Sequence, residues 1–341
     1  MEQLTLDVTG RIEWRDVPAP RLEGDGEALV RPLAVTRCDI DLPYVAGFLP
    51  PPRPFALGHE CVGEITALGD GVRGFRVGQR VIVPFQISCG QCDRCRRGQT
   101  GSCRTAGPGA SYGLGALGGL EWGGALADLV RVPYADAMLV PLPAGISARS
   151  VASMSDNIPD GWRTVAPGLE RWPGAPVLVV GGGAVGIPVY AVGIALALGA
   201  ERVDYLDHDP VRLARAERVG AHPVEGPYPR RAGRYPITVD ASGIPAGLVC
   251  ALRSTDVGGV CTSVAIYWDE VALPLLEMYT RGVTFVTARV DARAAIPAAL
   301  GLVDGGRFQP ELVTETVAPW DEAPAVLARH RAKTVIVRDD A

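Results

Sequence analysis

The second half of the chain alternates between short apolar runs and segments with helical periodicity. The runs "APVLVV" (175–180), "ITVDAS" (237–242), "GVCTSVA" (259–265) and "VTFVTA" (283–288) have the length of buried strands, and helical patterns separate them. Strands that alternate with helices are typical of a parallel sheet with helices on both faces. We therefore predict an α/β domain with a doubly wound parallel sheet over residues 153–289.

The first of these strands ends in a run of glycines. A helical pattern follows to Leu198, Gly199 closes it, and "RVDYLD" is the second strand. Glycines between a strand and a helix let backbone N–H groups approach a pyrophosphate at the helix N-terminus. The order of strand, glycines and helix therefore predicts a dinucleotide site at Gly181, Gly182, Gly183, Ala184, Val185 and Gly186.

Asp207 ends the next strand about 20 residues after the glycines, where an acidic residue recognises the ribose. A carboxylate there accepts a hydrogen bond from the 2′-hydroxyl and repels a 2′-phosphate, so we predict NAD rather than NADP. His208 follows directly and is a further candidate contact.

Proline suits a first helical turn, so Pro188 predicts a helix that begins beside it and leaves Gly186 in the loop.

The first half of the chain has a different pattern. Residues 1–152 are rich in glycine and proline and carry short alternating runs without a long helical period, which predicts a mostly β domain. Two domains are also the expectation for 341 residues.

The composition narrows the class of protein. A net charge of -5 without a long basic run argues against nucleic acid as a partner. The N-terminus lacks the basic start and apolar stretch of a signal peptide, and glycines and Pro188 interrupt the longest apolar run. We therefore expect a cytoplasmic protein that is not bound to a membrane.

Four cysteines lie close together in "SCGQCDRCRRGQTGSC" (88–103), with the spacing C-x2-C-x2-C-x7-C. In a reducing compartment, clustered cysteines bind metal more often than they form disulfides. Four thiolates in one loop close a tetrahedron around zinc and leave no position for water or substrate, which makes the site structural. An iron–sulfur cluster and a disulfide are the alternatives. The four residues are Cys89, Cys92, Cys95 and Cys103.

A second set of metal-ligating residues lies in "VTRCDIDLPY" and "FALGHECVGEITALGDGV". His59 precedes a period-two strand pattern, Glu60 follows it, and Cys38 stands upstream. A catalytic zinc takes three protein ligands from Cys, His and carboxylate side chains and keeps a fourth position open. Cys38 and His59 are therefore candidate ligands of a catalytic metal.

These residues resemble those of a known family. "GHECVGEITALGDGV" is similar to the zinc signature of the medium-chain alcohol dehydrogenases, and the four-cysteine loop resembles that family's structural-zinc lobe. "VRVPYADAMLVPLP" and "SMSDNIPDGW" resemble the branch of glutathione-independent formaldehyde dehydrogenase. The family implies a GroES-like catalytic domain at 1–152, completed by 290–341, a Rossmann domain at 153–289, and an active site between them.

The resemblance also assigns roles to side chains. In the formaldehyde dehydrogenase branch an aspartate is the third catalytic zinc ligand, which maps onto Asp156 beside Cys38 and His59. Glu60 lies behind these ligands or exchanges onto the metal. Asp41 is the implied partner of the other His59 ring nitrogen.

The resemblance implies an NAD-dependent oxidoreductase with two zinc ions, one catalytic and one structural. It transfers a hydride between NAD(H) and a small alcohol, aldehyde or ketone. Lys333, in "KTVIV", is assigned to the cofactor site. The segment "GVTFVTARV" is similar to the edge strand that joins two subunits, so we expect a homodimer or homotetramer.

Three features depart from the family pattern, and one of them is the spacing from Gly181 to Asp207, which is two residues longer than usual. Ile40 stands where relatives carry a Ser or Thr that relays the proton, and Asp160 replaces a Thr near the nicotinamide. The proton then leaves through water or through Asp160. An alternative is reduction of an iminium or a conjugated double bond with NAD(P)H, in a site lined by Asp39, Asp41 and Asp160. A non-catalytic zinc- and nucleotide-binding protein is less favoured, because only chemistry needs an open metal site.

Overall fold

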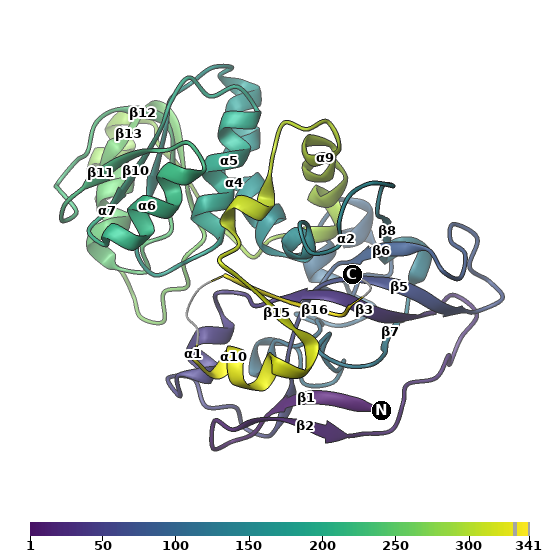
Figure 1. Cartoon of the computed structure of the whole chain (residues 1–341). Helices are drawn as coiled ribbons and strands as arrows, with labels where there is room; N and C mark the ends of the chain where they lie inside the picture. The colour runs from purple at the N-terminus through teal and green to yellow at the C-terminus, as the bar shows by residue number, and fades with distance from the viewer. Residues whose placement is uncertain (330–332, 340–341) are drawn as a thin grey trace. The chain divides into compact units, whose positions relative to one another are not determined.

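The computed structural model describes residues 1–329 and 333–339, which fold into two compact units (Figure 1). The first unit comprises Met1–Pro159, Asp291–Leu300 and Thr314–Ala341, and the second comprises Asp160–Val290 and Gly301–Val313. Residues 153–159 thus lie in the first unit and residues 301–313 in the second.

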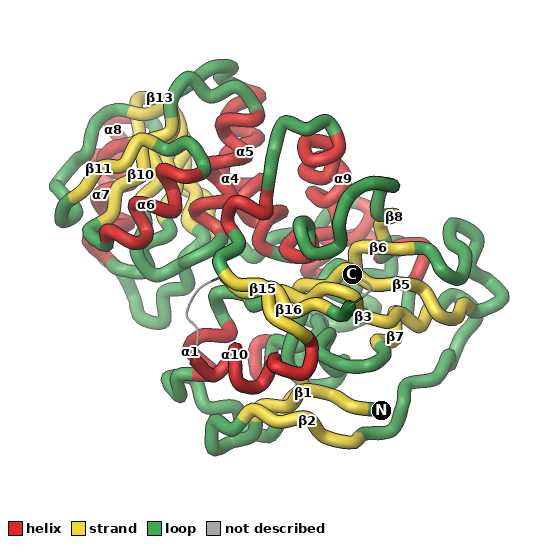
Figure 2. Tube along the Cα trace, viewed as in Figure 1, coloured by secondary structure: helices red, strands yellow, loops and turns green. Residues whose placement is uncertain are grey.

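The first unit consists mainly of strands and loops (Figure 2). A seven-stranded sheet has the order β15-β16-β3-β5-β6-β8, with β7 also paired to β3, and a three-stranded sheet has the order β2-β1-β4. The strands are β1 (Glu2–Leu6), β2 (Ile12–Asp16), β3 (Ala28–Thr36), β4 (Phe55–Ala56), β5 (Glu60–Leu68), β6 (Arg80–Val83), β7 (Val130–Val132), β8 (Val140–Pro141), β15 (Thr316–Pro319) and β16 (Thr334–Val337).

The helices of the first unit are short. They are α1 (Asp41–Val45), α2 (Asp93–Arg96), α3 (Ala135–Met138) and α10 (Ala323–Arg329), with 3₁₀ turns η1 (Thr100–Ser102), η2 (Gly115–Leu117), η3 (Ala152–Ser155) and η5 (Trp320–Glu322). The long helix α9 (Ala292–Asp304) is divided between the two units.

The centre of the first unit is the antiparallel pair β3 and β5, which places Val30 opposite Ile65. Both side chains are fully buried. On the other side of β3, the strand β16 pairs antiparallel, with Val335 opposite Thr36. A strand from the far end of the described chain therefore completes a sheet built from the first 150 residues, and the mostly β prediction is confirmed.

The second unit is a six-stranded sheet whose strands are all parallel, in the order β11-β10-β9-β12-β13-β14. In chain order this is 3-2-1-4-5-6, the order of dinucleotide-binding Rossmann folds, which confirms the predicted fold class. The strands are β9 (Val177–Val180), β10 (Val203–Asp207), β11 (His222–Glu225), β12 (Tyr235–Asp240), β13 (Thr255–Ser263) and β14 (Thr284–Thr287). The helices are α4 (Asn157–Arg171), which begins in the first unit, α5 (Ile187–Ala197), α6 (Pro210–Arg218), α7 (Pro245–Ser254) and α8 (Leu275–Arg281), and η4 spans Pro310–Val313.

The helix after the glycines begins at Ile187, with Gly186 as its N-cap and Pro188 in its first turn. The prediction from the proline is therefore confirmed. α5 is apolar on all sides and buried, because it packs against β9, β10 and η4 at once. Gly193 allows this close packing, since a Cβ there would lie 2.7 Å from the ring of Phe308.

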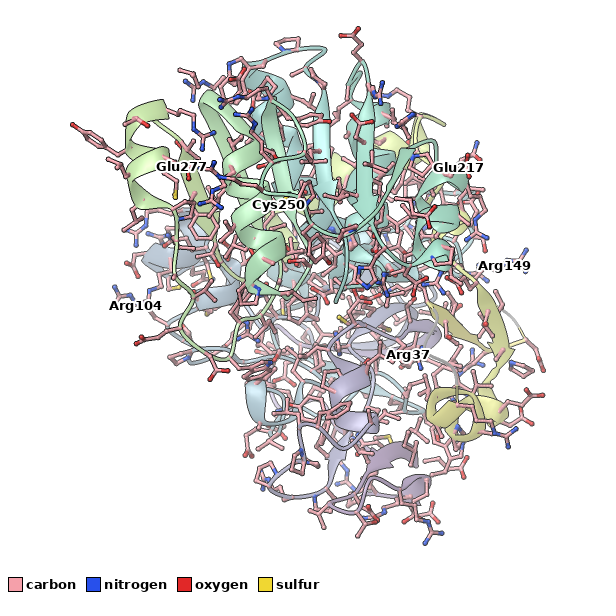
Figure 3. The ribbon with its side chains drawn as sticks, turned by 90° about the vertical axis from the view of Figure 1, so that its left-hand side faces the viewer. Arg37, Arg104, Arg149, Glu217, Cys250 and Glu277 are labelled. Carbon is pink, nitrogen blue, oxygen red and sulfur yellow. The ribbon has the colours of Figure 1, made fainter. Side chains whose placement is uncertain are left out.

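The cysteines outside the two clusters fill cores. Cys61 lies in the first unit, and Cys250 and Cys261 lie in the second, each no more than 1% exposed. Figure 3 labels Cys250 on α7 and Glu277 on α8, and Glu277 joins these helices by accepting a 2.9 Å hydrogen bond from Arg253.

Among the described residues, no helix is both long enough and apolar enough to span a bilayer.

Candidate metal and dinucleotide sites

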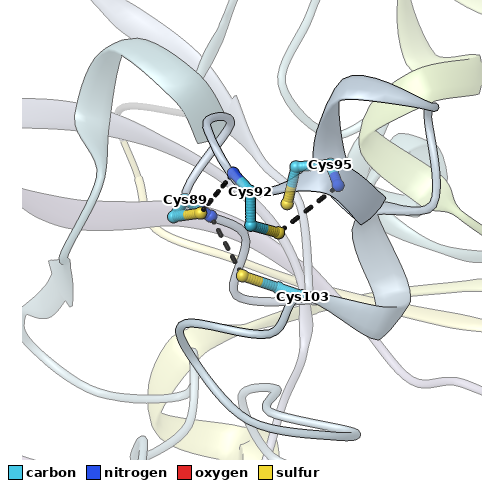
Figure 4. Close-up of side chains that lie close together, drawn as sticks. All are labelled: Cys89, Cys92, Cys95 and Cys103. Atoms are coloured by element: carbon cyan, nitrogen blue, oxygen red, sulfur yellow. Dashed lines mark hydrogen bonds between the residues drawn. The ribbon is translucent and has the colours of Figure 1, made fainter.

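The four cysteines of the 88–103 loop converge on one point (Figure 4). Their sulfur atoms all lie within 4.8 Å of one another. None is paired in a disulfide. The loop turns through α2 and η1, which point the side chains inward. The positions are Cys89, Cys92, Cys95 and Cys103.

Backbone N–H groups surround these sulfurs. Cys92 N donates to Cys89 Sγ at 3.4 Å, Cys95 N donates to Cys92 Sγ at 3.5 Å, and Ala106 N donates to Cys103 Sγ at 3.4 Å. Such bonds favour the thiolate, and those from Cys95 and Arg104 lower the pKa of Cys92 to about 6. Four converging sulfurs with amide support fit a tetrahedral thiolate site for zinc.

The second cluster holds Cys38, His59, Glu60 and Asp156, whose ligand atoms also lie within 4.8 Å of one another. All four side chains are buried. Cys38 Sγ lies 3.1 Å from Asp156 Oδ2, and His59 Nε2 lies 3.5 Å from the same oxygen. The structure thus brings the predicted ligands together in the first unit from three separate segments.

Local structure explains how these segments meet. Cys38 follows the end of β3, and His59 precedes β5, which is hydrogen-bonded to β3. Gly58 has φ +89°, and a Cβ there would lie 2.8 Å from the backbone of Leu126, so the turn into His59 requires glycine. Asp156 is held by its neighbour Ser155, whose hydroxyl donates to the carbonyl of Cys61 at 2.8 Å.

The electrostatics of this cluster fit a cation. Within the described chain, neither ring nitrogen of His59 has a hydrogen-bond partner, although the ring is fully buried. Burial lowers the pKa of His59, but Asp41 and Asp156 outweigh it and raise the pKa to about 9. Burial raises the pKa of the Cys38 thiol well above its ordinary value. A thiol, an imidazole and a carboxylate that are desolvated together form a donor set suited to zinc.

Asp41 lies at the first position of α1. Its Oδ2 accepts a 3.0 Å hydrogen bond from Cys38 N, and its Oδ1 is 3.8 Å from His59 Nδ1. It therefore touches two of the predicted ligands. Ile40, beside it, is the N-cap of α1, is partly buried and packs against the core of the first unit.

Glu60, which belongs to the same cluster, forms an ion pair with Lys333. The Nζ atom of Lys333 lies 2.9 Å from Glu60 Oε2 and 3.1 Å from Oε1, and both side chains are buried. Burial raises the pKa of Glu60 to about 7, against the lowering effect of Lys333. Lys333, assigned to the cofactor from the sequence, directs its ammonium group at Glu60, at the carbonyl of Arg37 and at Asn157.

The sequence analysis did not single out Asn157. Its side-chain amide lies between Lys333 and two predicted ligands, and its only sequence signal is its place directly after Asp156. Arg163 was also missed. It forms an ion pair with Asp160 in the second unit and donates to the carbonyl of Ala288 at 2.8 Å.

The glycine loop of the second unit is tightly built. A Cβ on Gly181 would lie 2.5 Å from Asp207 Oδ2, and one on Gly182 would lie 2.5 Å from Tyr228 Oη. Gly183 N donates to the carbonyl of Ser242 at 2.8 Å, and Ala184 N to the carbonyl of Ala241 at 3.2 Å. These two N–H groups are therefore used within the chain, and Val185 and Gly186 lead into α5.

Asp207 ends β10 and is fully buried. Its carboxylate accepts hydrogen bonds from the N–H groups of His208 at 2.7 Å and Asp209 at 2.9 Å. Arg212 of α6 adds two hydrogen bonds of 2.8 Å. A guanidinium therefore offsets the charge of Asp207, an arrangement that the sequence analysis did not predict.

Comparisons with known proteins agree with this picture. Residues 24–144 match the family model of the alcohol dehydrogenase GroES-like domain. The chain is 31% identical to a probable zinc-binding alcohol dehydrogenase of Mycobacterium tuberculosis, over 98% of this chain and 86% of that protein. It is 35% identical to the glutathione-independent formaldehyde dehydrogenase of Pseudomonas aeruginosa, over 62% of this chain and 55% of that enzyme.

A solved structure gives the same result. The alcohol dehydrogenase of Thermus sp. ATN1 superposes with a TM-score of 0.88 at 30% identity, and the match covers 99% of this chain and 100% of that one.

Proposed function

Because this chain belongs to the zinc-type medium-chain alcohol dehydrogenases and is an oxidoreductase of that family, we propose that it transfers a hydride between NAD and a small alcohol held at Cys38, His59 and Asp156. The observation that carries the proposal is the convergence of these three buried side chains within 4.8 Å. A purely structural metal site has no need of a carboxylate and an imidazole that leave one position open.

The side chains around the proposed metal site have separate roles. Zinc, when bound, supplies a Lewis acid that lowers the pKa of the alcohol hydroxyl, and the nicotinamide accepts the hydride. Cys38, His59 and Asp156 would hold the metal, and Asp41, whose Oδ1 lies 3.8 Å from His59 Nδ1, is the nearest carboxylate to the second ring nitrogen. Lys333 balances the charge of Glu60, so that Glu60 does not compete as a fourth permanent ligand.

We propose two zinc ions per chain, the second at the four cysteines, and NAD as the preferred dinucleotide. The carboxylate of Asp207 supports NAD, because it stands at the strand end that faces the ribose in this fold. Arg212 limits the preference, because its guanidinium offsets the carboxylate that would repel a 2′-phosphate.

We predict that two variants move the choice of cofactor in opposite directions. Asp207→Ser should favour NADP and Arg212→Leu should favour NAD, each changing the ratio of the two dissociation constants by about tenfold. Two unit charges 4 Å apart interact by roughly 1 kcal/mol in water and roughly 4 kcal/mol near a protein surface, and a tenfold effect of about 1.4 kcal/mol lies within this range. Calorimetric titration with NADH and NADPH measures both ratios. A wild type that binds NADPH more tightly would contradict the assignment of Asp207.

The proton released by alcohol oxidation needs a route past Ile40, and Asp160 is our candidate. Asp160→Asn keeps the size of the side chain but cannot take up a proton, so oxidation should slow by about 10²–10⁴-fold and lose part of its pH dependence. Arg163→Met is the matched control, because it removes the ion pair of Asp160 and leaves the carboxylate in place. Full activity of Asp160→Asn at every pH would exclude the relay.

The function itself is tested by cofactor turnover on a panel of alcohols, aldehydes and imines. We expect NAD reduction with a small alcohol and NADH oxidation with the matching aldehyde or ketone. Turnover of imines or conjugated double bonds alone would favour the alternative reductase, and Ile40→Thr would then add alcohol oxidation to it. Metal-loaded protein that turns over no member of the panel would contradict both activities.

We further propose that the protein is a homodimer or a homotetramer, as expected from the sequence. β14 is an edge strand of the parallel sheet, and side chains that follow β13 or lie on α8 are exposed, with Trp268 at 62%, Leu276 at 75% and Tyr279 at 85%. Exposed apolar groups beside an open strand edge mark an interaction surface. Light scattering should give a dimeric or tetrameric mass, and a monomer at micromolar concentration would refute the proposal.

A further inference from the structure

We propose that Asn157 is a positioning residue of the catalytic metal centre, which orients Cys38 and Asp156 and withdraws charge from the Cys38 sulfur. The inference rests on the metal site of the proposed function. It adds a residue that supplies no ligand atom and that acts on two ligands at once.

The amide nitrogen of Asn157 lies within hydrogen-bond distance of both anionic ligands. Its Nδ2 lies 3.1 Å from Cys38 Sγ and 2.9 Å from Asp156 Oδ2. The side chain is fully buried, so water does not compete for these protons. Hydrogen bonds to ionised acceptors are the stronger ones, and a buried site strengthens them further.

Lys333 decides which way the amide faces. Its Nζ lies 2.7 Å from Asn157 Oδ1, and an ammonium group only donates hydrogen bonds. A flipped amide would place its NH₂ group against the ammonium and its oxygen against the two ligands, which are acceptors. The lysine cannot move away, because Glu60 and the carbonyl of Arg37 take its other protons. The amide orientation is therefore fixed from both sides.

The charges of the site support this role. Cys38 as a thiolate and Asp156 as a carboxylate match the two charges of a zinc ion, while Lys333 matches Glu60. Asn157 links the pair of Cys38 and Asp156 to Lys333 without adding a charge of its own. A hydrogen bond to the thiolate lowers the energy of the sulfur lone pairs, so the sulfur donates less charge to the metal and the metal remains a stronger Lewis acid. Partners of metal ligands commonly change metal affinity by about 10–100-fold.

A simpler role predicts different results. Asn157 is also the first residue of α4, and it could serve only to satisfy Lys333. In that case, Asn157→Asp would preserve the contact to Lys333, and its added negative charge would leave the zinc affinity unchanged or higher. If Asn157 positions the ligands, the same variant loses the N–H donor and binds zinc more weakly.

The first experiment is chelator competition on the zinc-loaded full chain. Asn157→Asp and Asn157→Leu should bind the catalytic zinc about 10–100-fold more weakly than the wild type, and the zinc at the four cysteines should be retained. Thr164→Val is the matched control. Thr164 is buried on the same helix as Asn157 and donates to the carbonyl of Gly161, not to a ligand, so its loss should lower stability alone.

The second experiment measures the charge-transfer absorption of the Cys38 sulfur. Each protein is loaded with cobalt(II), and the spectrum of its Cys38→Ser form is subtracted, which leaves the thiolate-to-cobalt charge-transfer band of Cys38. This band should move to longer wavelength in Asn157→Asp and Asn157→Leu, because a sulfur without the N–H donor gives up its electron more easily. In Thr164→Val it should keep the wild-type position.

The outcomes separate this inference from the function on which it rests. A wild type without a Cys38-dependent band would refute the catalytic metal site and the inference with it. A wild type that shows the band, with variants that keep both its position and the zinc affinity, would overturn the role of Asn157 alone. If Asn157→Leu does not fold, Asn157→Asp decides, because it keeps the shape of the side chain and the acceptor for Lys333.

Discussion

Asp156→Ala is expected to lose the catalytic zinc and nearly all turnover while the chain stays folded. Asp156 is one of the three proposed ligands, and its loss should weaken zinc binding by more than the roughly 100-fold expected when an outer partner of a ligand is removed. The four cysteines are built by a separate loop, so their zinc should remain. Elemental analysis should therefore fall from two zinc ions per chain to one.

Asp136→Ala is the matched control for this variant. Asp136 is an aspartate of the same unit whose carboxylate accepts hydrogen bonds from the N–H groups of Arg73 and Gly74. Its loss should leave the metal content and the activity at wild-type values. An Asp156→Ala protein that kept two zinc ions and its turnover would exclude Asp156 as a ligand.

Cys95→Ser should have its main effect on stability. Structural zinc sites contribute roughly 10–16 kcal/mol in small zinc-binding peptides. Even a quarter of that is a large share of the roughly 5–15 kcal/mol that stabilises a typical domain. We expect a markedly lower melting temperature and loss of the zinc held at 88–103, with the Cys38 centre still able to load.

Cys250→Ser provides the comparison for this second prediction. Cys250 is equally buried, but it lies in the core of the second unit, away from any metal cluster. It should destabilise the protein by the smaller amount typical of a core substitution and keep both zinc ions. Equal melting temperatures for Cys95→Ser and the wild type would contradict a structural role for the four cysteines.

The parts of this protein that could be predicted from sequence are those encoded by local patterns. The run of apolar residues before Gly181 and the proline at 188 define the strand, the loop and the start of α5, because strand length and proline geometry are properties of neighbouring residues. The spacing of the four cysteines likewise reflects one short loop. Cys38 and His59 are candidates from their residue types and context, but Asp156 is predicted only through the resemblance, since the meeting of three segments depends on the tertiary fold.

The remaining features lie between segments that no local pattern connects. Lys333 and Glu60 are 273 residues apart, and Lys333 and Asn157 are 176 apart. Their pairing follows from the position of β16 beside β3, which a period of two cannot predict. Arg212 looks like an ordinary basic residue of an amphipathic helix. Only the fold shows that Arg212, in the first turn of α6, reaches Asp207 at the end of β10.

The late position of β16 bears on how the protein is made. During synthesis the first 159 residues leave the ribosome before the second unit. The partners of β3 and Glu60, which are β16 and Lys333, are translated only after the second unit. Until Lys333 emerges, the nascent chain holds a carboxylate whose buried position is costly without its cation. The second unit needs only residues 301–313 in addition to residues 160–290, so it can fold before the first unit is complete. The sheet of the first unit and the pair of Lys333 with Glu60 are therefore completed only after the second unit has been translated.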